Sequence, residues 1–190
     1  MIAAQIEREV EQWATLGHPA LLQRFVLRNG AEMPGRARPK GMRKLADRAC
    51  FRNSTMAAAR YGWRYCEGLA SSAALKHCGF VTLHAWNLDD DGNLVDLTWK
   101  DPANSLYLGL VIPDAQQRMV EQGTYGLLDT GCGLNHRLMF EIDPDLEAIV
   151  KAIRRPEAIE EALRQRDSKH DDRRFSGESI TGFGEIGTNA

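Results

Sequence analysis

The stretch HAWNLDDDGNLVDLTW, residues 84–99, decides how this chain folds. Its two ends are rich in branched and aromatic residues and flank the polar run DDDGN, a pattern typical of two antiparallel strands joined by a turn. If residues 82–88 pair with residues 94–99 across that turn, the side chains of His84 and Asp96 come within reach of each other. A carboxylate beside a histidine fixes the orientation of the ring and favours its charged form.

The same stretch partly matches a calcium-binding loop. The first, third, fifth and sixth positions of an EF-hand loop are filled by Asn87, Asp89, Asp91 and Gly92. The twelfth position, which should be a bidentate Glu, is Thr98. Because the flanks are also typical of strands rather than helices, we expect a solvated hairpin turn and no calcium site.

The rest of the chain predicts helices before and after a set of strands. Apolar spacing, good helix formers and Gly or Pro boundaries predict helices over residues 2–16, 19–29, 50–61, 114–122 and 143–166. Aromatic and branched residues predict strands over residues 63–70, 80–88, 93–99 and 105–112. Residues 30–48, with their Gly, Pro and basic residues, predict a loop. This order of elements favours the α+β class.

The bulk composition is that of an ordinary globular protein. The 190-residue chain is 43% hydrophobic and 26% charged, with a formal net charge of −2, which favours neither a nucleic-acid binder nor a strongly acidic binder. No apolar run approaches the ~18 residues of a membrane span, and the N-terminus lacks the apolar core of a secretion signal. We expect one domain over residues 1–167 with its core at about 48–112, a flexible tail over 168–190, and a cytoplasmic protein without membrane contact.

The chain has four cysteines, which we expect to be free thiols. Cys50 is the strongest candidate for a nucleophile because it stands at the start of the helix predicted over 50–61. The dipole and the free N–H groups at that end of a helix lower the pKa of a thiol, and the basic residues before Cys50 add positive potential. Cys132, in the stretch TGCGLN, is the second candidate, since Cys66 and Cys78 lack such a setting.

The order of motifs along the chain carries a resemblance. Cys50 is followed by His84 in the sequence HAW and by Asp96 in the sequence DLT. This order resembles the transglutaminase-like branch of the papain-like cysteine enzymes. Residues 48–112 also look like small proteins of that type in phages and bacteria, through the motifs CFRNS, YCEGLA, HAWN, DGNLVDLTW and YLGL. The resemblance implies a papain/transglutaminase-like fold, with a catalytic helix on an antiparallel sheet, and a triad of Cys50, His84 and Asp96.

These residue types predict acyl transfer through a thioester. His84 would take the proton of Cys50, or hold it in a thiolate–imidazolium pair. The thiolate would attack an acyl carbon, and Asp96 would orient His84. The backbone N–H of Cys50 and a second donor would hold the oxyanion, which is typically worth ~3–4 kcal/mol per donor. Because no Gln or Trp stands at the usual place before Cys50, Asn53 or another backbone N–H is the candidate for the second donor.

Four further residues have a structural and a functional interpretation. Glu67 either lines the cleft or faces water at a sheet edge. Trp86, Trp99 and Tyr107 either shape a substrate pocket or pack in the core of the sheet. A zinc site is conceivable from His77, Cys78, Cys132 and His136, but the chain has no C-x₂-C pair, and we expect neither a metal nor another cofactor.

The sequence leaves two classes of function open. The first is a cysteine-dependent enzyme that acts on a protein, a peptide or a small-molecule amide, as a hydrolase, a deamidase or a transferase. The second is a non-catalytic binding protein on the same scaffold that captures a host protein or a small ligand. Residues 36–48, with six basic residues and one acid, are either a solvated loop or a contact for phosphate or nucleic acid. The oligomeric state stays open.

Overall fold

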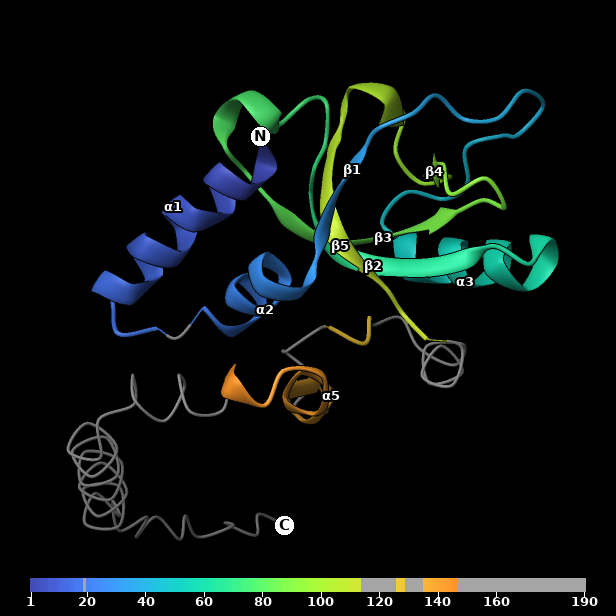
Figure 1. Ribbon diagram of the computed structural model, residues 1–190. Coiled ribbons are helices and arrows are strands. Elements are labelled where there is room, and N and C mark those ends of the chain that lie inside the picture. Colours follow the sequence, from blue (N-terminus) through green and yellow to red (C-terminus); the bar gives the residue numbers. More distant parts are fainter. Residues whose placement is uncertain (19, 114–125, 129–134, 147–190) are drawn as a thin grey trace, which may run out of the picture. The chain divides into compact units, whose positions relative to one another are not determined.

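The computed structural model describes residues 1–18, 20–113, 126–128 and 135–146, all of which belong to one compact unit within Met1–Ile153 (Figure 1). The helix predicted over 114–122, most of the one predicted over 143–166, and the tail predicted over 168–190 lie outside the described residues.

Two amphipathic helices begin the chain. Helix α1 (Ile2–Thr15) buries Ile2, Ile6 and Val10 at steps of four residues, which is the spacing of one helix face. Helix α2 (Leu21–Asn29) buries Leu21, Phe25 and Val26. Both helices contact each other and strand β5 (Leu106–Val111), and their apolar faces form one core cluster with Leu69 and Leu108 of the sheet. The two N-terminal helices predicted from the sequence are therefore confirmed.

Five antiparallel strands form one sheet in the order β1-β5-β2-β3-β4 (Figure 1). They are β1 (Ala31–Pro34), β2 (Arg64–Ser71), β3 (Thr82–Leu88), β4 (Leu94–Val95) and β5. Together with the helices they confirm the α+β class. Strand β1 lies in the segment predicted as a loop, where a short pairing of Ala31–Pro34 with β5 overrides the Gly- and Pro-rich composition.

The hairpin between β3 and β4 is present, but its second strand is shorter than predicted. The Asp89 carboxylate accepts the N–H groups of Asp91 and Asn93 at 3.1 and 2.7 Å and so fixes the turn. Pairing stops after the register Asn87↔Val95 and Leu88↔Leu94. Residues 96–99 leave the sheet, because the Asp96 side chain accepts backbone N–H groups of the residues that follow it and competes with strand pairing. The prediction of a strand up to Trp99 was wrong.

Helix α3 (Cys50–Tyr61) runs along the sheet and contacts β2 and β3. Its last turn ends at Gly62, whose φ of +72° suits a glycine at a helix C-terminus. Two short 3₁₀ turns, η1 (Lys76–Cys78) and η2 (Pro102–Asn104), and helix α5 (Asn135–Ile142) complete the described elements. Helix α5 falls in a stretch for which the sequence predicted no helix. No helix among the described residues has the length and apolarity to cross a membrane.

Candidate functional site

A buried histidine–carboxylate pair links β3 to the segment after β4. The Nε2 atom of His84 lies 2.9 Å from Oδ2 of Asp96, and the two residues are 2% and 1% exposed. Because β4 pairs only with the last two residues of β3, the part of β3 around His84 is open on that side to residues 96–99. The contact between His84 and Asp96 that the hairpin predicted is present.

The Asp96 carboxylate has donors on both oxygens. Its Oδ1 accepts the N–H groups of Thr98 at 2.7 Å and of Trp99 at 3.2 Å. Its Oδ2 accepts the Tyr107 hydroxyl at 2.9 Å in addition to His84. A buried carboxylate with this many donors keeps its charge and its position. Asp96 is thus a rigid acceptor for the histidine.

Cys50 is the first residue of α3, and the interaction of its thiol with the side chain of His84 is one of the causes that raise the pKa of His84. Since Nε2 of the ring is held by Asp96, the nitrogen that remains for the thiol is Nδ1. The first turn of α3 contains no acidic residue, and no side chain caps its N–H groups. Arg48, shortly before, has a φ of +60°, a strained conformation for a residue with a Cβ.

The surroundings of His84 stabilise its charged form. Burial disfavours the imidazolium, but hydrogen bonds and charge interactions with Asp96 and Cys50 outweigh this effect and raise the pKa of His84 to about 9, from an ordinary 6.5. Burial by itself would raise the pKa of Asp96, but His84, the Thr98 N–H and the Tyr107 hydroxyl lower it below its ordinary value. The pair is therefore an imidazolium–carboxylate at neutral pH.

Aromatic rings enclose the histidine. The Trp99 ring stacks on His84, with 3.9 Å between the ring centroids and 15° between the planes. Trp86 and Tyr107 lie with centroids 6.3 and 6.2 Å away. Both are buried in one cluster with Cys66 and Ala70, and the Trp86 Nε1 donates to the Met33 sulfur at 3.1 Å. In this structure Trp86 and Tyr107 pack in the core of the sheet.

Two paired glycines lie in the sheet beside these rings. Gly68 pairs with His84 on one side and with Gly109 on the other. A Cβ on Gly109 would come within 2.6 Å of the Trp86 ring and would clash with the Glu67 carbonyl oxygen. The absence of side chains here makes room for the rings beside His84.

Asn53 connects helix α3 to the segment that carries Asp96. Its Nδ2 donates to the Ala46 carbonyl at 2.8 Å and to the Thr98 hydroxyl at 3.0 Å. These two bonds use both of its N–H groups. The structure therefore places Asn53 between the loop that precedes Cys50 and the turn that carries Asp96, where it holds the two together; its N–H groups are engaged and do not point at the thiol.

Glu67 is completely buried and binds backbone from another part of the chain. Its Oε1 accepts the Tyr65 hydroxyl at 2.7 Å and the Leu127 N–H at 2.8 Å, and its Oε2 accepts the Leu128 N–H at 2.8 Å. Leu127 packs in one cluster with Cys50. Glu67 therefore anchors Leu127 and Leu128, and the interpretation as a water-facing edge residue was wrong. The separation of 60 residues hid this link from sequence reasoning.

The other cysteines differ from Cys50. Cys66 is fully buried, and burial, opposed only in part by Arg64, raises the pKa of its thiol to about 12. Cys78 is exposed. Cys132 lies outside the described residues. The histidine contact distinguishes Cys50 from both described alternatives.

No metal centre emerges from the part of the chain that the structure describes. Within it, no group of three or more His, Cys, Asp or Glu side chains is arranged to hold a metal ion. The Asp89 side chain, one of the EF-hand matches, is used by its own turn. Cys132 of the conceivable zinc set is not described.

Comparison of the chain with protein-family models, with curated proteins and with solved structures gave no match.

Proposed function

We propose that this protein is a cysteine-dependent acyl-transfer enzyme in which Cys50, His84 and Asp96 form the catalytic triad. The observation that carries the proposal is that the buried side chain of His84 interacts with the thiol of Cys50, the first residue of α3, and is bound through Nε2 to the Asp96 carboxylate at 2.9 Å. Any one of these residues alone would more often be structural. The proposal includes a papain/transglutaminase-like arrangement, which the helix start at Cys50 and the strand position of His84 support.

The chemistry follows from the three side chains. In the resting pair His84 already holds the proton of Cys50 as an imidazolium beside a thiolate, and the Cys50 sulfur forms a bond to the acyl carbon of an amide. When the tetrahedral intermediate collapses, the C–N bond breaks and the amine leaves with the proton of the His84 imidazolium. His84 next takes a proton from water or from an acceptor amine, which attacks the thioester and releases Cys50. Asp96 keeps the ring in place throughout.

The oxyanion would be held by backbone donors. The N–H of Cys50 and its neighbours in the first turn of α3 have no partner within the helix, as in any helix start. Each such donor is typically worth ~3–4 kcal/mol of transition-state stabilisation. We favour these groups over Asn53, because both N–H groups of the Asn53 amide already have acceptors.

Burial of the site favours the second candidate function, a binding protein on the same scaffold. Cys50 is 9% exposed and His84 2% exposed, and Leu127 belongs to the same buried cluster as Cys50. In a protein that only binds, the triad would be a structural ion pair with a neighbouring thiol. For an enzyme, the segment at Leu127 has to move before an acyl group reaches Cys50.

Turnover assays, combined with a search for an acyl adduct on Cys50, distinguish the acyl-transfer enzyme from the binding protein. The full chain is incubated with quenched peptides, to detect hydrolysis, and with glutamine-containing peptides plus a dye-labelled primary amine, to detect transfer. We expect turnover in one of the two reactions, its loss in Cys50→Ala, and an acyl mass on Cys50 after acid quenching. Turnover that survives in Cys50→Ala would contradict the role of Cys50, and the absence of both turnover and an acyl mass on Cys50 would favour the binding protein.

A further inference from the structure

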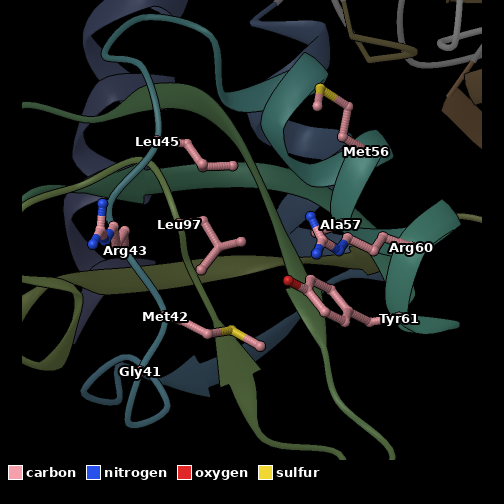
Figure 2. A pocket seen from close by; sticks show the side chains of 9 residues that line it. All are labelled: Gly41, Met42, Arg43, Leu45, Met56, Ala57, Arg60, Tyr61 and Leu97. Atoms are coloured by element: carbon pink, nitrogen blue, oxygen red, sulfur yellow. The ribbon is translucent and has the colours of Figure 1, made fainter.

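A groove of about 390 Å³ lies between residues 41–45 and helix α3. Its apolar lining consists of Met42, Leu45, Met56, Ala57 and Leu97. Figure 2 shows Leu45, Leu97 and Met42 on one side and Met56 and Tyr61 of the helix on the other. Met56 is 55% exposed and Leu45 36% exposed. Large aliphatic side chains gathered in an exposed hollow are typical of a binding surface.

The groove is joined directly to the proposed triad. Leu97 follows Asp96 in the chain, and its carbonyl accepts the Leu45 N–H at 2.6 Å. The helix that carries Cys50 at its start also supplies Met56, Ala57, Arg60 and Tyr61 to the groove. A molecule bound here therefore lies against the same helix and the same turn that hold the catalytic groups.

The rim of the groove is positively charged. Arg43 and Arg60 belong to its lining, and neither forms an ion pair within the part of the chain that the structure describes. Residues 36–64 contain nine Arg or Lys and a single acid, Asp47, whose carboxylate is bound by Lys44 at 2.7 Å. The formal net charge of the whole chain is −2, so this positive region is local. Its charge complements an acidic ligand.

From the aliphatic floor and the cationic rim, we propose that the groove binds an acidic segment of a polypeptide substrate by one aliphatic side chain. This inference rests on the proposed acyl-transfer function and names its substrate class. The aliphatic side chain would enter between Leu45 and Met56, and flanking carboxylates would pair with Arg43 and Arg60.

The lining favours a polypeptide over a nucleic acid. Single-stranded nucleic acids are held largely by bases that stack on exposed aromatic rings. The ring in this lining, Tyr61, is already stacked on Trp63 with 4.6 Å between centroids, and the Arg60 guanidinium lies 5.4 Å from its centroid. The other apolar side chains of the lining are not aromatic, which suits a Leu-like side chain.

The helix also sets the spacing between the recognised side chain and the reacting bond. Met56 and Arg60 lie six and ten positions after Cys50, which at 1.5 Å per residue is roughly 9–15 Å along the axis. An extended peptide covers that span in about three to five residues. The inference therefore places the acidic, aliphatic motif about three to five residues from the amide that reacts.

Fluorescence anisotropy on the full chain tests the groove without any need for turnover. The probe is a dye-labelled peptide with one Leu in the middle of a run of Glu, measured with the wild type and with Cys50→Ala. We expect saturable binding to both proteins and a weakening of about tenfold or more in Arg60→Glu. The matched control is Arg52→Glu, the same charge reversal at an exposed position of the same helix outside the groove; its affinity should stay within about twofold of wild type.

Two further probes decide the chemistry of the ligand. A peptide with Ser in place of Leu should bind about tenfold more weakly, because it leaves the aliphatic floor unfilled. Equal affinity for the Leu and Ser peptides, or equal losses in Arg60→Glu and Arg52→Glu, would reduce the effect to general charge attraction and overturn the proposal. The proposal would also be overturned if a dye-labelled oligothymidylate bound more tightly than the Leu peptide and lost as much affinity in Arg60→Glu.

These outcomes are independent of the catalytic proposal. If the peptide binds at the groove but Cys50 forms no acyl adduct, the groove proposal is supported and the acyl-transfer proposal is contradicted. An acyl adduct on Cys50 without peptide binding at the groove would do the reverse.

Discussion

His84 and Trp99 lie face to face, with their ring centroids 3.9 Å apart and their planes 15° from parallel. The histidine is charged at neutral pH, because Asp96 and Cys50 raise its pKa to about 9. A cation on an indole face is stabilised by the ring quadrupole, by about 2 kcal/mol where water is excluded. Trp99 therefore both shields the ion pair from water and favours its charged form.

Removal of the Trp99 ring should lower the pKa of His84. In Trp99→Ala the cation–π contact is lost, and we expect this loss to outweigh the hydration of the ring, so the imidazolium is less favoured. The measurement is an NMR titration of the His84 ring protons in wild type and variant. Trp99→Phe, which keeps an aromatic face, should restore most of the value. A pKa that is the same in Trp99→Ala and wild type would show that the stacking is only packing.

The ion pair should make the stability of the protein depend on pH in the alkaline range. The pKa of His84 is raised in the folded protein, so its stabilising effect is complete below about 6.5, the ordinary value, and is lost as the pH rises through about 9. The pKa of Asp96 is lowered, so its effect is present above its ordinary value and is lost on acidification through the folded value.

Denaturant unfolding at several pH values measures this effect. Wild type should lose free energy of unfolding between pH 7 and pH 10, and Asp96→Asn should lose much less over the same range. Asp96→Asn should also be less stable at pH 7 by about 3–5 kcal/mol, because it leaves a buried partner without its counter-charge. Asp90→Asn, at an exposed turn position, is the control and should match wild type. Parallel pH curves for wild type and Asp96→Asn would contradict the assignment.

Glu67 should control access to Cys50. Glu67→Gln replaces a carboxylate oxygen that accepts a backbone N–H of Leu127 or Leu128 by an NH₂ group, which cannot accept it. An unsatisfied buried N–H costs about 1–3 kcal/mol, and the segment at Leu127 is held less tightly. We expect a lower melting temperature and faster alkylation of Cys50, with Cys78 unchanged as the internal reference. Alkylation of Cys50 at the wild-type rate would show that Leu127 does not limit access.

Local patterns predicted most of the elements that form the site. The α3 start at Cys50, the turn after β3 and the contact of His84 with Asp96 follow from helix boundaries, turn residues and hairpin geometry, all of which act over a few residues. The end of β4 was missed because the Asp96 carboxylate accepts the N–H groups of Thr98 and Trp99. Strand propensities of single residues do not account for a side chain that competes with strand pairing for backbone N–H groups.

Long-range contacts explain what the sequence did not predict. Glu67 looked like an edge residue because its partners, Leu127 and Leu128, lie far along the chain. Strand β1 exists because β5 offers it an edge, although its own residues are unremarkable for a strand. The role of Trp99 on His84 depends on the turn at Asp96, which brings the two rings together.

The most direct measurement of the central claim is the rate at which iodoacetamide modifies each cysteine between pH 5 and pH 9, followed by mass spectrometry. If Cys50 is paired with a charged His84, it should react near pH 6 faster than the exposed Cys78, while the buried Cys66 stays unmodified, and His84→Ala should remove the advantage of Cys50. A Cys50 that stays inert across the range, or that reacts identically in wild type and His84→Ala, would contradict a catalytic triad at this site.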